Sequence, residues 1–195
     1  MTTPAADSPP AFAPTPIRWI NLVWCAVALA LMAGVIHSEN FFALNFLHVA
    51  AGMLWTGIDL FMGFVIGPAL RASPFEARRE VLTRITPKTI FILPVLAIIT
   101  GTTGWYLAKQ TGYLDLDYPA FWWVLAALVI VTLLSVQGLG ILLPTQIRVY
   151  RELCKAEPDR AKIMRLNASY FYLIAMQGLL QVLIVLIMAR FRAGL

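Results

Sequence analysis

The sequence contains little cysteine, histidine or charge. Its 195 residues include two cysteines and two histidines, and 13% of the residues are charged. Two cysteines exclude a scaffold held together by disulfides, and two histidines exclude a site built from three or more imidazoles. Soluble domains carry about 25% charged residues, so this charge content excludes a soluble globular protein. The P-loop, the dinucleotide-binding glycine pattern and the nucleophile elbow are also missing.

Apolar residues dominate instead, at 60% of the chain with a mean hydropathy of +0.78. A helix needs about 20 apolar residues to cross a bilayer. The sequence therefore predicts an all-α, polytopic membrane helix bundle with five transmembrane helices, at about 17–36, 42–70, 89–108, 121–147 and 168–189. Residues 17–195 form a single transmembrane bundle in this interpretation. Residues 1–16 are rich in proline, which resists helix, and we expect a flexible cytoplasmic tail there.

Basic residues flank these apolar segments unevenly. Of the 15 Lys and Arg residues, all but Lys109, Arg190 and Arg192 fall on one side of the predicted spans. An excess of Lys and Arg marks the cytoplasmic side, so we expect the N-terminus inside and the C-terminus outside a bacterial cytoplasmic (inner) membrane. Anionic lipid headgroups account for the net charge of +5. The lipid bilayer, and not nucleic acid, is therefore the expected partner.

The second predicted span carries a stripe of polar, small and aromatic residues. At about 100° per residue, His48, Gly52, Trp55, Asp59 and Met62 fall on one side of a helix. Ionisable residues inside a membrane are expensive and mark functional sites, so His48 and Asp59 are the first candidates. They are separated by about 16 Å along the helix axis and do not reach each other.

Structural roles for these residues stay open as alternatives. His48 then bonds a neighbouring helix, and Asp59 caps a packing network or meets an arginine from the cytoplasmic side. His37, after the first span, comes near His48 if the two spans form a hairpin, and two imidazoles can bind one haem iron or one copper. Gln177 and Gln181 are four apart and share a face of the fifth span, as part of a polar network or a transport path.

The pattern Leu47-His48, six residues, Trp55, then Gly57 and a Gly67–Leu70 exit resembles the membrane domains of the copper resistance (CopD) family. The histidine-to-tryptophan spacing is also similar to that of HemJ-type protoporphyrinogen oxidases, which are small haem b membrane proteins. Bacterial membrane proteins of the DUF2269 type look similar too. The resemblance implies a compact helical bundle in which His48 is an axial ligand of haem or copper.

Three functions follow as hypotheses. In the first, His48 binds one haem b for redox chemistry or electron transfer, with Gly52 and Trp55 beside the macrocycle. In the second, the chain is a copper permease, and His48, Asp59 and Met62 line its path. In the third, the chain is a non-catalytic subunit or assembly factor of a larger membrane complex, or a homo-oligomer, and the stripe is an interface. No pattern assigns a catalytic residue.

Overall fold

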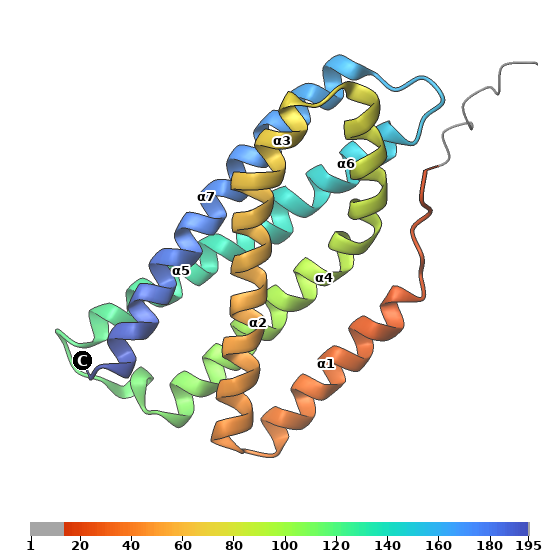
Figure 1. The fold of residues 1–195 in the computed structure, drawn as a ribbon. Coiled ribbons are helices and arrows are strands. Elements are labelled where there is room, and N and C mark those ends of the chain that lie inside the picture. Colours follow the sequence, from red (N-terminus) through yellow and green to blue (C-terminus); the bar gives the residue numbers. More distant parts are fainter. Residues whose placement is uncertain (1–13, 195) are drawn as a thin grey trace, which may run out of the picture.

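The computed structural model describes residues 14–194, which form helices and short connections without a strand (Figure 1). The predicted tail at 1–16 therefore lies mostly outside the described residues. Within its last part, the backbone oxygen of Thr15 accepts a hydrogen bond of 2.5 Å from the Tyr150 hydroxyl. The chain just before the first helix is thus held against one end of the bundle.

Four continuous helical rods are long and apolar enough to cross a membrane: Phe41–Ala72, Phe75–Gln110, Phe121–Leu153 and Arg160–Arg192. The first rod contains α2 (Phe41–Phe61), η1 (Met62–Ile66) and α3 (Gly67–Ala72). The second is α4 (Phe75–Gln110), and the fourth is α7 (Arg160–Arg192). The third contains α5 (Phe121–Ser135), η3 (Val136–Leu142) and α6 (Leu143–Leu153). A one-turn helix, η2 (Tyr113–Asp115), lies between α4 and α5.

The first predicted span forms a shorter helix, α1 (Asn21–His37), with 17 residues and no buried side chain. At 1.5 Å per residue it is about 26 Å long, less than the hydrocarbon core of a bilayer. It lies beside α4 at one edge of the bundle (Figure 1), where the Asn21 side chain donates to the Pro87 oxygen at 3.4 Å. Four of the five predicted spans are therefore found as long apolar helices, and a crossing by α1 stays a prediction.

Helix starts follow local chemistry. The Asn40 side chain accepts from the Ala43 N–H at 2.9 Å before α2, and Asp159 accepts from the Lys162 N–H at 3.0 Å before α7. Such caps satisfy backbone donors that the first helical turn leaves unpaired. The last three rods extend beyond their predicted apolar spans because the polar residues 75–88, 148–153 and 160–167 continue the helices.

The first and the third rod each contain a π-helical segment before a proline. The Gly67 N–H bonds the Met62 oxygen, and the Leu143 N–H bonds the Gly138 oxygen, five residues back in each case. Pro68 and Pro144 follow directly and have no N–H of their own to donate. A wider turn at this point lets the helix continue past the proline. The first and third rods therefore share the same sequence of α-helix, π-helical segment and proline-containing α-helix.

The connections α3–α4 and α6–α7 lie at the same end of the bundle, which we call the basic end; α1–α2, α4–α5 and the C-terminus lie at the opposite end (Figure 1). Two arginines there join elements. Arg78 donates to the oxygens of Leu70 at 2.8 Å and Arg71 at 3.1 Å, and Arg79 donates to the Leu153 oxygen at 2.9 Å. These two side chains therefore hold helix ends together in addition to marking the basic end.

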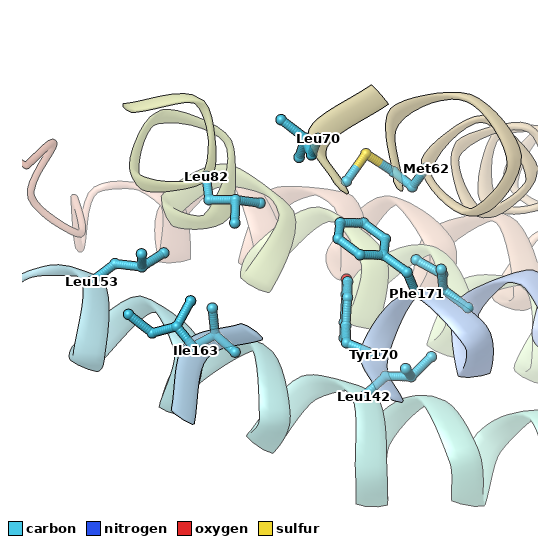
Figure 2. Close-up of a cluster of buried hydrophobic side chains, with 10 residues drawn as sticks. Met62, Leu70, Leu82, Leu142, Leu153, Ile163, Tyr170 and Phe171 are labelled. Atoms are coloured by element: carbon cyan, nitrogen blue, oxygen red, sulfur yellow. The ribbon is translucent and has the colours of Figure 1, made fainter. Parts of the chain in front are cut away.

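The apolar core has two parts. A first apolar cluster, nearer the basic end, joins η1, α3, α4, η3, α6 and α7, and it is drawn in Figure 2. It contains Met62, Leu70, Leu82, Leu142, Val149, Leu153, Ile163, Tyr170, Phe171 and Ile174. A second apolar cluster, nearer the opposite end, contains Trp55, Ala127, Ile130, Leu134 and Ile187. Buried polar side chains lie between the two clusters.

Candidate functional site

A fully buried carboxylate, that of Asp59, lies on α2 just before the π-helical segment η1. Its side chain is 0% exposed. Gln177 and Gln181 of α7 each donate from Nε2 to the Asp59 Oδ2 atom, at 2.7 and 3.0 Å. Because the two glutamines are four residues apart, both amides extend from one face of α7. The structure thus brings together three of the residues that the sequence singled out.

These hydrogen bonds leave three oxygen atoms without a protein partner. Asp59 Oδ1, Gln177 Oε1 and Gln181 Oε1 are buried, and none has a hydrogen bond within residues 14–194. In the same part of the chain, Asp59 forms no ion pair with an arginine or lysine. A buried carboxylate with only neutral partners is costly in a low-dielectric interior. The cluster therefore has one uncompensated acidic group and an excess of acceptors.

A cavity of about 30 Å³ adjoins the Asp59 carboxylate. Its polar lining comes from Trp55, Asp59, Ser135, Gln146, Tyr170 and Gln177, and its apolar lining includes Pro94 of α4. This volume accommodates roughly two water molecules. The cavity therefore provides room beside the acceptor-rich cluster for a small polar ligand.

A second, smaller cavity of about 10 Å³ lies nearer the basic end. Gln146 and Tyr170 line both cavities and separate them. Thr86 and Asn167 also line the smaller one, and the Asn167 Nδ2 atom is buried without a partner within residues 14–194. Gln146 Nε2 in turn donates to the Thr89 hydroxyl at 2.5 Å. Polar groups therefore continue from Asp59 towards the basic end.

His48 lies about two turns into α2 and faces α4. Its Nδ1 atom is 3.0 Å from the Thr100 backbone oxygen and 3.3 Å from the Thr103 hydroxyl. A carbonyl oxygen only accepts, so Nδ1 carries the proton and donates. The Thr103 hydroxyl donates to the Ile99 oxygen at 2.6 Å and keeps its lone pairs for the imidazole. In the neutral ring, the free lone pair is therefore on Nε2.

A glycine on α4 makes the position of this imidazole possible. A Cβ atom on Gly104 would lie 2.8 Å from His48 Cε1 and 3.2 Å from Nδ1, closer than real contacts allow. Gly101, one turn earlier, has open space where a Cβ would be. The α4 surface near the half-buried His48 is thus formed by small residues, and part of it is uncovered.

The remaining predicted residues of the stripe have separate neighbours. Gly52 lies against Thr100, whose Cγ2 atom would be 3.4 Å from an added Cβ. Trp55 is 4% exposed and lines the Asp59 cavity, and Met62 belongs to the first apolar cluster. His37 is exposed at the end of α1. The stripe is therefore divided, because α2 packs against α4 on one side and α7 on another.

A metal site built from several ionisable ligands is not seen. Within residues 14–194, no three His, Cys, Asp or Glu side chains lie together in a way that would hold a metal ion. The thiols of Cys25 and Cys154 are free. A metal bound at His48 would therefore need ligands of other kinds.

Several residues of the site were not singled out from the sequence. Gln146 and Asn167 belong to this group as cavity-lining residues. Thr100 and Thr103 were noted only as polar residues of the third span and not as partners of His48, whereas Tyr170 was expected on the same helix face as Gln177 and Gln181. Threonine in a membrane helix commonly bonds its own backbone, so its presence indicates nothing specific. Asn167 lay outside the predicted fifth span, and only the longer α7 brings its side chain into the core.

Comparison with known proteins adds no relative: no family model, no curated protein and no solved structure matches the chain. The resemblance to the CopD, HemJ and DUF2269 types therefore stays a prediction from the motif around His48.

Proposed function

We propose that this multi-pass membrane protein binds one haem b through Nε2 of His48 and takes part in electron transfer. The four long apolar helices are compatible with an integral membrane protein. His48 lies in the half of α2 nearer the opposite end of the bundle, which the charge distribution predicts to be the outer half. The redox chemistry comes from the haem iron; the protein supplies the ligand and its surroundings.

The observation that carries this proposal is the hydrogen bond from His48 Nδ1 to the Thr100 oxygen. Histidine ligands characteristically donate their other ring N–H to a carbonyl or carboxylate, which fixes the tautomer and makes the ligating nitrogen more basic. The Thr103 hydroxyl lies at 3.3 Å from the same nitrogen. This bonding holds the ring in the tautomer that would leave Nε2 free to bind a haem iron.

The α4 surface beside the imidazole is formed by small residues. Gly104 allows the ring edge to approach the α4 backbone, and the space at Gly101 is open. Small residues of this kind let a planar group lie close to a helix. Copper is supported less well, because within residues 14–194 no group of three His, Cys, Asp or Glu side chains could hold a metal ion, and copper prefers several such ligands.

The test is the absorption spectrum of protein purified from haem-replete cells. We expect a haem b Soret band in the wild type, its loss in His48→Ala, and its retention in the matched control His37→Ala. Added imidazole should restore the band in His48→Ala, because the free ligand replaces the missing ring. A colourless wild type, or a band that survives in His48→Ala without imidazole, contradicts the proposal.

A further inference from the structure

We propose that Asp59, together with Gln177 and Gln181, forms an exchangeable binding site for one monovalent cation, a proton or Na⁺, that enters from the basic end of the bundle. This site is separate from His48, whose imidazole bonds α4, and it does not depend on haem binding. The proton and Na⁺ share the relevant chemistry: each carries one positive charge and binds to oxygen atoms.

The charge of the cluster indicates a monovalent cation. Asp59 is fully buried, and within residues 14–194 it faces neutral groups: the amides of Gln177 and Gln181 and the indole of Trp55. A single added positive charge neutralises the carboxylate and removes the cost of an unpaired buried ion. A divalent cation would leave an excess positive charge and would find only one carboxylate, where such ions prefer several anionic oxygens.

The unpaired atoms also indicate a cation. Asp59 Oδ1, Gln177 Oε1 and Gln181 Oε1 are all acceptors, and all are buried without a partner within the described chain. The Ser135 hydroxyl donates to the Val131 oxygen at 2.8 Å, so its lone pairs stay available in the cavity wall. A proton on the carboxyl supplies one missing donor, whereas Na⁺ contacts several oxygens at once. The cavity of about 30 Å³ leaves room for a water molecule beside the ion.

The two cavities give the direction of entry. The larger one adjoins Asp59, the smaller one lies towards the basic end, and Gln146 and Tyr170 line both. Figure 2 shows Tyr170 among the side chains of the first apolar cluster, beside Leu142 and Phe171. On the other side of Asp59, the second apolar cluster fills the space between α2, α5 and α7. A cation from the basic end therefore passes the first apolar cluster where the side chains of Gln146, Asn167 and Tyr170 interrupt it, and the second apolar cluster lies beyond the site.

The surroundings contain few other groups that titrate or carry charge. Tyr170 of α7 is the titratable side chain that lines the cavity with Asp59. The residues that α4, α5, η3 and α6 contribute to the wall are uncharged, as is Trp55 of α2. A change in the charge of this interior region is therefore assigned to Asp59 when it is lost in Asp59→Asn and retained in Tyr170→Phe.

The experiment is infrared difference spectroscopy of the protein in lipid bilayers under buffer exchange. One arm raises the pH from mildly acidic to mildly alkaline in N-methyl-D-glucamine buffer without Na⁺. The other arm adds Na⁺ at constant mildly acidic pH. We expect the wild type to lose the carbonyl stretch of one protonated carboxyl group per chain, and Asp59→Asn to lack this change. Asp117→Asn, an exposed loop variant, is the matched control and should keep it.

The two arms identify the cation. Loss of the band on adding Na⁺, with release of a proton, indicates competition between Na⁺ and the proton at Asp59. Loss in the pH arm alone indicates a site for the proton only. The substitution Asn167→Leu, in the wall of the smaller cavity, should slow the response without removing it. The proposal is overturned if neither arm gives a change that Asp59→Asn abolishes.

Discussion

His48 and Asp59 are on the same polar stripe of α2, yet each bonds a different helix. His48 donates to the Thr100 oxygen of α4, and Asp59 accepts from two glutamines of α7. The eleven residues between them separate the groups by about 16 Å along the axis. The stripe is therefore two candidate sites, one beside small residues of α4 and one beside a cavity.

The first prediction compares two substitutions of Asp59. Asp59→Asn removes the buried charge and keeps an oxygen that accepts from Gln177 or Gln181, so we expect a melting temperature equal to or above that of the wild type. Asp59→Leu leaves both amides without an acceptor, at a cost of about 1–2 kcal/mol for each amide. Thermal unfolding in detergent measures the difference. A leucine variant as stable as the asparagine variant contradicts the hydrogen-bonded cluster.

The second prediction concerns the glycine under the imidazole. In Gly104→Ala the added Cβ lies 2.8 Å from His48 Cε1, so the ring must leave its place on α4 and its bond to Thr100. We expect a lower haem content than in Gly101→Ala, where the added methyl group meets no atom within 4 Å. Haem per purified chain is the measurement. Equal haem content in the two variants contradicts the position assigned to the ligand.

At the scale of elements, the π-helical segments begin near the candidate cation site. Asp59 precedes η1 by three residues. Of the cavity wall, Ser135 directly precedes η3 and Gly138 lies within it. A π turn shifts the register of the residues that follow it and is frequent at functional sites. The two π-helical segments therefore set how the parts of each rod on either side of them face α7.

The third prediction tests this helix packing. A Cβ on Gly63 of η1 would lie 2.9 Å from the Cα atom of Ala175, and a backbone atom cannot move aside easily. We expect Gly63→Ala to destabilise the protein by about 1–3 kcal/mol. Gly57→Ala, where the methyl group meets open space, should stay within about 0.5 kcal/mol of the wild type. Similar unfolding curves for both variants would show that η1 and α7 are not in close contact.

The sequence predicted most of the helices but few of the contacts between them. Apolar runs predicted the four long rods, because a lipid-spanning helix needs a long continuous stretch of such residues. It placed the start of α7 at residue 168 instead of Arg160, because the polar first two turns carry no apolar signal. The shared face of Gln177 and Gln181 followed from their spacing. Their bond to Asp59 did not, because the pairing of α2 with α7 depends on tertiary packing.

At the scale of the whole molecule, the bundle is asymmetric along its axis. The α3–α4 and α6–α7 connections lie at one end together with most of the basic residues, and the two cavities extend from Asp59 in that direction. The second apolar cluster and His48 lie in the other half. The proposed cation site therefore opens towards the basic end of the bundle, and the proposed haem ligand lies in the opposite half.

The fourth prediction is the orientation of the bundle. In a background without Cys25 and Cys154, we expect Glu157→Cys, in the α6–α7 connection, to be protected in spheroplasts from a membrane-impermeant maleimide. Asp117→Cys, in the α4–α5 connection, should be labelled, because the basic end faces the cytoplasm when positive charge sets the topology. Inverted vesicles should give the opposite result. Labelling of Glu157→Cys in intact spheroplasts contradicts the predicted orientation.

The most direct measurement is the haem content per chain of the purified wild type, His48→Ala and Asp59→Asn proteins. We expect one haem b per chain in the wild type and in Asp59→Asn, and none in His48→Ala, because His48 is the proposed ligand. A wild-type protein without haem, or the same content in His48→Ala, would contradict the proposed function and leave the Asp59 site to be judged by its own experiment.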